Sequence, residues 1–162
     1  MPRRRLPLWC GLAALLAGCP SAYQRTYDQT TQRLEQQAQA TDAEQARLHA
    51  QAKRYAAVVY FPLGSDVVGA DGQRELNWFV QQMQPYPQAT FDVQGFTDDS
   101  GSEAGNQALG EQRAANVPAY LEAQGIAGSR MQVTGFGQSY PAGSNAPAPG
   151  RRDNRRVEVT VR

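Results

Sequence analysis

Two residues of opposite charge, Asp98 and Arg113, flank a polar turn and are the side chains best suited to hold an ionic ligand. Asp98 follows an alternating apolar pattern that ends at Gly95, and Arg113 lies within a helical pattern. On a helical wheel Arg113 shares the apolar stripe of Leu109 and Val117 instead of lying on the solvated face. A guanidinium in that stripe needs an anionic partner, and Asp98 is the candidate. The pair is either a structural ion pair or part of a ligand site.

The residues around this pair favour the second interpretation. The segment contains Thr97-Asp98, Gly101, Asn106, Leu109 and Arg113-Ala114 in that order. It resembles the core motif of the OmpA-like peptidoglycan-binding domain, which is also found in peptidoglycan-associated lipoproteins. Further matches occur downstream at Gly125-Ile126, Arg130, Gly135-Phe136-Gly137, Pro141, Gly150-Arg151 and Asn154-Arg155-Arg156-Val157-Glu158.

The resemblance covers about residues 57–162 and implies a function. It places the diaminopimelate side chain of the peptidoglycan stem peptide between Asp98 and Arg113, with Thr97, Asn106 and Leu109 in the same site. Asn106 is polar and stands at the start of a helix, where it either caps the helix or lines the site, and we expect the cap.

The chain departs from the family pattern at three places. Phe96 stands where the family commonly has His, and Gly110 where it usually has Ser. Residues 62–65 lack the Asp that often follows the first strand of the family.

The chemistry of such a ligand suits this pair of side chains. Diaminopimelate ends in a carbon that carries both an ammonium and a carboxylate group. Arg113 can hold a carboxylate through two parallel hydrogen bonds while Asp98 accepts from the ammonium. Backbone N–H groups at the start of the helix also favour the anion.

The N-terminus is typical of an exported lipoprotein. Three arginines at residues 3–5 precede an apolar run over residues 6–16, which predicts a secretory signal peptide. The next residues, Leu16-Ala17-Gly18-Cys19, resemble the lipobox of bacterial lipoproteins. This implies cleavage after residue 18 and acylation of Cys19, with fatty acids such as palmitate. Pro20 follows instead of Asp, which by the family sorting rule implies an anchor in the outer membrane, facing the periplasm.

Charge and cysteine usage exclude several classes of function. The chain has 16 basic and 15 acidic residues, and removal of the three leader arginines leaves 13 basic groups, a net charge of −2. We therefore expect no nucleic-acid partner. Cys10 leaves with the leader and Cys19 is lipidated, so no disulfide or thiolate metal site is expected. Four arginines, at positions 151, 152, 155 and 156, are expected to pin the last strand and make the ligand pocket positive.

Residues 19–55 form a lipidated N-terminus and a spacer. From Ser21 to Phe61 the chain has no Gly or Pro and is rich in Ala, Gln, Glu and Arg, which predicts a helix. The residues that recur at seven-residue intervals are Tyr27, Leu34, Thr41, Leu48 and Tyr55, although the companion positions are weak. The spacer is thus a solvated helix or, as the alternative, a self-associating coiled coil.

Residues 56–162 predict a two-layer α/β (α+β) sandwich, βαβαββ-like with a mixed four-stranded sheet. Strands are expected at residues 58–61, 90–95, 131–134 and 157–162, with a surface loop over residues 139–150. Asp71 is expected to cap the first helix of the domain, and Pro118 to kink the second near residues 114–117.

The globular part contains no histidine and no nucleophile elbow, so we expect no catalysis, and we expect no cofactor or metal. Three classes of function remain. The first is a non-catalytic tether that binds diaminopimelate-type peptidoglycan and joins the outer membrane to the cell wall. The second is an envelope subunit whose main ligand is another periplasmic protein. The third, an enzyme acting on the wall, lacks the catalytic groups it would need.

Overall fold

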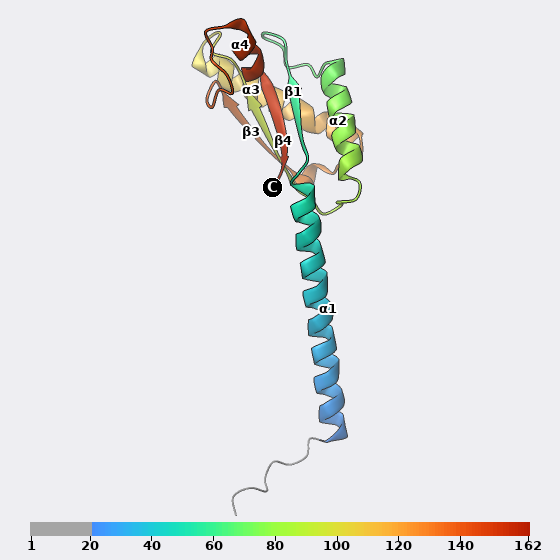
Figure 1. Cartoon of the computed structure of the whole chain (residues 1–162). Helices are drawn as coiled ribbons and strands as arrows, with labels where there is room; N and C mark the ends of the chain where they lie inside the picture. The colour runs from blue at the N-terminus through green and yellow to red at the C-terminus, as the bar shows by residue number, and fades with distance from the viewer. Residues whose placement is uncertain (1–20) are drawn as a thin grey trace, which may run out of the picture. The chain divides into compact units, whose positions relative to one another are not determined.

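Helices and strands alternate along the globular part, as the hydrophobic pattern predicts. The computed structural model describes residues 21–162 (Figure 1). The elements are α1 (Ala22–Ala52), β1 (Ala56–Tyr60), α2 (Ala70–Met83), β2 (Phe91–Phe96), α3 (Glu103–Ala123), the 3-10 turn η1 (Gly128–Arg130), β3 (Met131–Gly137), α4 (Ala148–Asn154) and β4 (Arg156–Val161). The predicted signal peptide and the lipidated Cys19 lie outside the described residues.

The spacer is the single helix α1, which has 31 residues. At 1.5 Å per residue the helix is about 46 Å long. Tyr27 and Leu34, two members of the seven-residue repeat, are 59% and 60% exposed. The contacts within the chain define two units that divide inside α1, between Ala43 and Glu44. Self-association through the repeat stays a prediction.

The four strands form one mixed sheet in the order β1-β4-β2-β3. β4 pairs antiparallel with both β1 and β2, whereas β2 pairs parallel with β3. The parallel pair shifts register after Gly95, so that Phe96 lies opposite Gly137. The α/β sandwich with a mixed four-stranded sheet is therefore confirmed.

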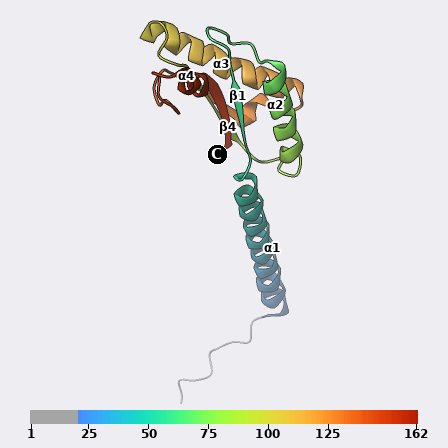
Figure 2. The same ribbon diagram turned by 45° about the horizontal axis from the view of Figure 1, so that its top comes forward.

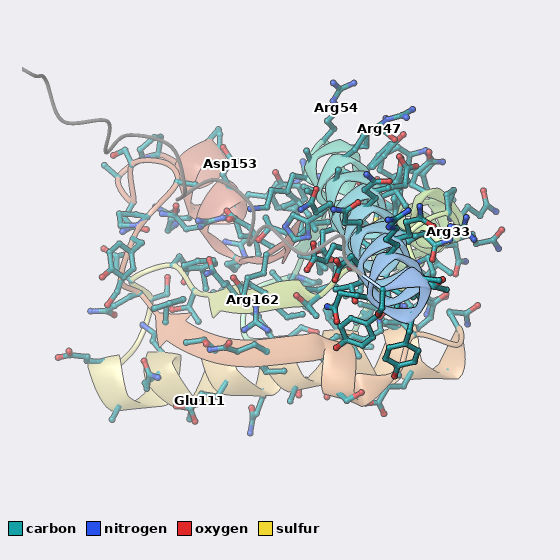
Figure 3. All side chains as sticks on the ribbon, turned by 90° about the horizontal axis from the view of Figure 1, so that it is seen from below. Arg33, Arg47, Arg54, Glu111, Asp153 and Arg162 are labelled. Atoms are coloured by element: carbon teal, nitrogen blue, oxygen red, sulfur yellow. The ribbon has the colours of Figure 1, made fainter. Side chains whose placement is uncertain are left out.

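The core lies between one face of this sheet and the helices α2 and α3. Val157, Val159 and Val161 alternate inward along β4, as the sequence pattern predicts. Together with apolar residues of both helices they form the core cluster, whose fully buried members include Val59, Leu76, Phe79, Phe91, Val93, Val117 and Leu121. Figure 3 shows Glu111 of α3 and Asp153 of α4 on opposite sides of the strands.

Glycines allow α3 to lie directly on β2 and β3. A Cβ atom at Gly95 would stand 2.1 Å from the Gly110 carbonyl oxygen, and one at Gly110 would stand 2.8 Å from the Gly137 backbone nitrogen. A Cβ at Gly135 would likewise stand 2.6 Å from the backbone nitrogen of Glu111. Because no side chain fits between the backbones here, the helix and the sheet are in main-chain contact.

α3 continues through Pro118 as one uninterrupted helix. The helix therefore does not restart at this proline, and the expected kink near residues 114–117 stays a prediction. Pro118 is buried on the side of the helix that packs against the core, beside Val117 and Leu121. The helix ends before Gly125, whose φ of 94° lies in the left-handed region that favours glycine.

Two local predictions were wrong. Gly69, not Asp71, is the N-cap residue of α2; Asp71 lies within the first turn, where its carboxylate pairs with Arg74. The predicted loop over residues 139–150 also contains the start of α4, which runs from Ala148 to Asn154. Proline at the first turn of a helix is compatible with helix formation, because its missing N–H has no intrahelical partner there.

Candidate ligand-binding site

Asp98 lies in the loop between β2 and α3, and its carboxylate is buried, with 3% of the side chain exposed. Its Oδ2 accepts a hydrogen bond from Arg155 Nη1 at 2.8 Å. Its Oδ1 accepts from the backbone N–H of Ser100 at 3.2 Å. Of the two interpretations of the Asp98 and Arg113 pair, the direct structural ion pair is therefore wrong, because the partner of Asp98 is Arg155.

Arg113 is fully buried, as its place in the apolar stripe predicts. Its guanidinium donates to three backbone carbonyl oxygens: Nε to Ser65 at 2.7 Å, Nη1 to Phe96 at 2.9 Å and Nη2 to Pro62 at 3.1 Å. Two of these carbonyls belong to the loop between β1 and α2, and the third ends β2. Arg113 thus fastens that loop to the end of β2.

Burial lowers the pKa of the Arg113 guanidinium to about 10. The negative charge of Asp98 opposes this shift, and the positive charge of Arg155 adds to it. Arg113 therefore stays charged at neutral pH. The ring of Phe61, whose centroid lies 5.1 Å from the guanidinium carbon, also faces the cation.

Arg155 joins Asp98 to the first loop from the other side. Its Nε donates to the carbonyl oxygen of Phe61 at 3.0 Å, while its Nη1 binds Asp98. Its side chain is 15% exposed, in contrast to that of Arg113. The sequence placed Arg155 in a basic cluster that pins the last strand, and the bond to Phe61 does link the start of β4 to the end of β1.

A pocket of about 430 Å³ opens beside Arg155, and we call it the arginine pocket. Figure 2 shows the strand β1 between α2 and α4, the three elements that supply most of its walls. It carries two arginines and two carboxylates, so it can meet both charges of a zwitterion. Its lining residues are Val58, Tyr60, Phe61, Pro62, Asp71, Gly72, Glu75, Arg152 and Arg155.

Thr97, Asn106 and Leu109 surround the start of α3. Thr97 is buried; its backbone N–H donates to the Gly137 carbonyl at 2.8 Å, and its hydroxyl has no partner among the described residues. Asn106 is also buried and donates from Nδ2 to Gln138 Oε1 at 2.7 Å. Leu109 is half-buried.

The helix cap is Ser102, so the prediction that Asn106 caps α3 was wrong. Ser102 has an extended backbone, and its hydroxyl oxygen accepts from the N–H of Gly105 at 3.1 Å. Both residue types are good caps. The chain enters the helix at Ser102, four residues before Asn106, and this decides between them.

Phe96, which stands where the family commonly has His, belongs to an aromatic group. Its ring stacks on Phe136 with the centroids 5.4 Å apart. The guanidinium carbon of Arg156 lies 4.0 Å from the Phe96 centroid, and Arg156 Nε donates to Glu158 at 2.6 Å. One nitrogen of Arg156, Nη1, is buried without a partner among the described residues.

Two general features concern the part of the chain that the structure describes, residues 21–162. No helix there combines the length and the apolar character that crossing a membrane would require. The same residues contain no group of three or more His, Cys, Asp or Glu side chains arranged to hold a metal ion.

A mixed sheet backed by two helices, with a charged site on the loops at one end, defines an OmpA-like domain. The chain belongs to the OmpA family, whose model matches residues 60–155. The peptidoglycan-binding protein ArfA of Mycobacterium tuberculosis is 40% identical over 98 residues, which are 60% of this chain and 30% of that protein. The probable lipoprotein YiaD of Escherichia coli is 35% identical over 103 residues, which are 64% of this chain and 47% of that protein.

Solved structures agree with this assignment. The peptidoglycan-associated lipoprotein from Burkholderia pseudomallei matches with a TM-score of 0.62 and 28% identity, over 65% of this chain and 90% of that one. The cell wall anchor of the T6SS from Pseudomonas aeruginosa matches with a TM-score of 0.56 and 28% identity, over 65% of this chain and 80% of that one. The chain spans less than half the length of the two curated relatives above.

Proposed function

We propose that this domain binds peptidoglycan non-covalently and so anchors the protein to the cell wall. Relatives named as a peptidoglycan-binding protein and as a cell wall anchor support the proposal. The observation that carries it is the ion pair of Asp98 with Arg155 at the wall of the arginine pocket. A partly exposed cation held by a buried carboxylate is suited to receive a ligand that carries both charges.

The ligand group is the free amino-acid end of diaminopimelate. Its carboxylate binds Arg155, because that guanidinium lines the pocket and is partly exposed. Its ammonium binds Asp98, whose carboxylate can accept further hydrogen bonds besides those from Ser100 and Arg155. The zwitterion thereby inserts between the two residues, and each keeps a partner of opposite charge.

Arg113 is a positioning residue in this scheme. All three of its nitrogens already donate to backbone carbonyls, and none of the side chain is exposed. It holds the first loop and the end of β2 in place, and these segments in turn place Phe61 and Asp98 around Arg155. Its positive charge also makes the surroundings of Asp98 more favourable for a carboxylate.

Sacculus co-sedimentation tests the proposal. The full chain is mixed with purified diaminopimelate-type sacculi and with lysine-type wall, and the bound fraction is measured after centrifugation. We expect binding to the first and weak binding to the second, because lysine lacks the distal carboxylate. Equal binding to both wall types would show that no residue reads that carboxylate. Failure to bind either would leave a periplasmic protein as the main ligand.

We also propose that the domain is a binding module and not an enzyme. The charged groups of Asp98, Arg113 and Arg155 are held in an ion pair and in backbone contacts, and the domain has no histidine to serve as a general base. Incubation with sacculi should therefore release no muropeptides. Soluble fragments detected by mass spectrometry would contradict this.

For the localisation of the protein we propose a lipid anchor at Cys19 in the outer membrane. It rests on the resemblance of residues 16–19 to a lipobox. A Cys19→Ala variant should move from the membrane fraction to the soluble periplasmic fraction in the native host. An unmodified Cys19 in the mass spectrum of the mature wild-type protein would rule the anchor out.

A further inference from the structure

β1 lies at one end of the sheet, and within residues 21–162 it pairs with a single strand, β4. The Phe61 N–H donates to the Arg155 carbonyl oxygen at 2.9 Å, and this bond shows which way the main-chain groups along β1 point. Because the direction alternates between neighbouring residues of an antiparallel strand, the N–H and C=O groups of Val59 and Phe61 face β4. Those of Val58 and Tyr60 face the open edge of the sheet.

The arginine pocket follows this open edge. Val58 and Tyr60 line it, together with Phe61 and Pro62, which come next in the chain. An extended chain rises about 3.3 Å per residue, so the segment from Val58 to Phe61 borders about 10 Å of the pocket. The pocket therefore offers a row of main-chain donors and acceptors besides its charged side chains.

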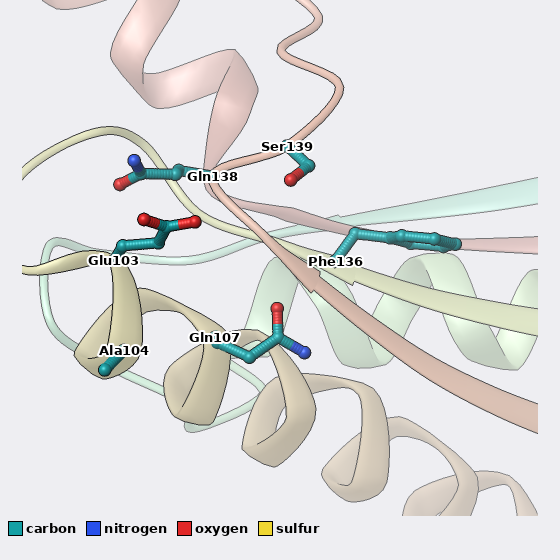
Figure 4. A pocket seen from close by; sticks show the side chains of 6 residues that line it. All are labelled: Glu103, Ala104, Gln107, Phe136, Gln138 and Ser139. Carbon is teal, nitrogen blue, oxygen red and sulfur yellow. The ribbon is translucent and has the colours of Figure 1, made fainter.

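The edge strand at the other end of the sheet, β3, is in a different situation. Gln107 of α3 donates from Nε2 to the Gly135 carbonyl oxygen of β3 at 3.0 Å. Figure 4 shows Gln107 at a smaller pocket, of about 290 Å³, between the first turns of α3 and the residues that follow β3. A main-chain acceptor of β3 is thus bonded within the protein, whereas the outward groups of Val58 and Tyr60 face a pocket.

The charges of the arginine pocket are segregated by element. Asp71 and Glu75 come from α2, whereas Arg152 and Arg155 come from α4 and the residue that follows it. β1 runs between α2 and α4 (Figure 2). Arg152 is exposed and forms no ion pair with any of residues 21–162. A carboxylate bound at the edge of β1 is therefore attracted to the α4 side and repelled from the α2 side.

We propose that the stem peptide of peptidoglycan lies along the open edge of β1, and that the amides on both sides of its diaminopimelate bond to the main chain of Val58 and Tyr60. The inference rests on the proposed function, in which Arg155 and Asp98 hold the free amino-acid end of that diaminopimelate. A short carbon chain links this end to the peptide backbone, so the backbone lies beside the strand that leads to Phe61.

The stem peptide carries a second free carboxylate, on the glutamate that precedes diaminopimelate. This carboxylate binds Arg152 on the α4 side of the pocket. Main-chain contacts also add a selectivity that Arg155 and Asp98 lack. Any free amino acid offers a zwitterion to such a pair, but only a peptide offers amides to an edge strand.

Calorimetric titration of the full chain with two ligands tests the inference. One ligand is free diaminopimelate, and the other is the tetrapeptide L-alanyl-γ-D-glutamyl-diaminopimelyl-D-alanine. We expect the tetrapeptide to bind about tenfold more tightly, because it adds main-chain hydrogen bonds and an ion pair. Equal affinities for the two ligands would overturn the inference.

A proline variant with a matched control tests the main-chain contact. Val58→Pro removes an outward N–H and keeps the bonds to β4, since proline is tolerated on an edge strand. It should weaken tetrapeptide binding about fivefold and leave diaminopimelate binding unchanged. Ala56→Pro removes the equivalent N–H beyond the pocket and should bind both ligands like the wild type.

A modified ligand gives the same test without a change to the protein, in case Val58→Pro does not fold in thermal melts. A tetrapeptide that is N-methylated at the amide between glutamate and diaminopimelate cannot donate to the edge strand. It should bind the wild type about fivefold more weakly than the unmodified tetrapeptide. Unchanged affinity for this ligand would refute the main-chain contact.

Arg152→Gln tests the contact with the glutamate carboxylate. The variant should bind the tetrapeptide severalfold more weakly than the wild type does. A tetrapeptide whose glutamate is amidated to isoglutamine lacks this carboxylate, so the variant and the wild type should bind it equally. An equal loss of affinity for both tetrapeptides would show that Arg152 does not bind the carboxylate.

The two proposals fail in different ways. If diaminopimelate and the tetrapeptide bind equally well and both need Arg155, the proposed function stands and the strand-edge inference is wrong. If the tetrapeptide binds, depends on the Val58 N–H and is unaffected by Arg155→Gln, the strand-edge inference stands and the proposed role of Arg155 is wrong.

Discussion

Arg113 and Arg155 both contact the loops at one end of the sheet, but their guanidinium groups have different hydrogen-bond partners. Arg113 comes from the middle of α3 and donates only to backbone carbonyls. Arg155 comes from the start of β4 and divides its bonds between one carbonyl and the carboxylate of Asp98. The first arginine has no exposed surface, whereas the second has some.

The difference in hydrogen-bond partners suits Arg113 and Arg155 to different roles. A cation that is bonded to the backbone on every nitrogen cannot release those bonds to a ligand without opening the loop. A cation that is paired with a carboxylate can accept a ligand carboxylate while its first partner takes the ligand ammonium. We therefore expect loss of Arg113 to affect mainly stability, and loss of Arg155 to affect mainly binding.

The largest expected effect follows replacement of Arg113. Arg113→Met keeps an unbranched apolar stem but leaves three carbonyl oxygens without their donor, and should lower the free energy of unfolding by about 4 kcal/mol. Urea denaturation measures this. The matched control Arg74→Met, at an exposed arginine of α2, should change stability by less than about 0.5 kcal/mol. A comparably small loss in Arg113→Met would show that the carbonyl contacts contribute little.

Replacement of Arg155 should separate binding from folding. Arg155→Gln should lower sacculus binding more than about tenfold, because the ligand carboxylate loses its cation. Stability should fall by about 2 kcal/mol, less than in Arg113→Met, because the site is partly exposed and Gln can still donate to a carbonyl. Thermal melts confirm folding before binding is measured. Arg162→Gln, at an exposed arginine, is the control and should bind like the wild type. Full binding by Arg155→Gln would show that another residue binds the ligand carboxylate.

Asp98→Asn tests the other half of the pair. It keeps the shape of the side chain and should lower the affinity for free diaminopimelate about tenfold, because the ammonium loses its counter-charge. Combined with Arg155→Gln it forms a double-mutant cycle. A stability coupling of about 1–2 kcal/mol is expected for the ion pair. If the double variant still binds sacculi like the wild type, the pair is purely structural.

The smallest effect is expected at Pro118. Pro118→Ala restores a backbone donor to α3 but removes a buried ring, so the free energy of unfolding should change by no more than about 1 kcal/mol in either direction. Sacculus binding should be unchanged, because the residue lies beyond Arg113 along the helix. A clear loss of binding would mean that the course of α3 itself, and not Arg113 alone, controls the site.

Much of the fold follows from the sequence because its causes are local. The alternation of Val157, Val159 and Val161 predicts a strand with one covered face, and that face is buried. The helical spacing around Arg113 likewise predicts its burial. Such patterns report the period of the backbone and the side that faces the core.

The partners of the buried charges did not follow from the sequence. Backbone carbonyls bind Arg113, and every residue carries one, so no residue type marks them. Asp98 pairs with an arginine 57 positions away, and that choice depends on how β4 ends beside the first loop. The one sequence feature that pointed to the partner of Asp98 was the basic cluster that contains Arg155, because clustered buried arginines require a carboxylate nearby.

Residues 139–150 show a further limit. Three prolines and several small residues predict a loop, and most of the segment has no regular structure. The part of this segment before α4 is held by Asn154, the last residue of that helix, which is fully buried and bonds to both the carbonyl and the N–H of Gly143. These contacts are made across a turn, and the local sequence pattern gives no sign of them.

The main-chain contact between Gly95 and Gly110 has a consequence for the reach of Arg113. An arginine side chain has a fixed length, so the height of its helix above the sheet determines where the guanidinium ends. With glycine on both sides, the guanidinium reaches the carbonyl at the end of β2 and two carbonyls of the loop after β1. A single methyl group at Gly95 would raise the helix and withdraw that head from the loop. The lack of a side chain at Gly95 and at Gly110 therefore determines how far the Arg113 side chain extends beyond the helix.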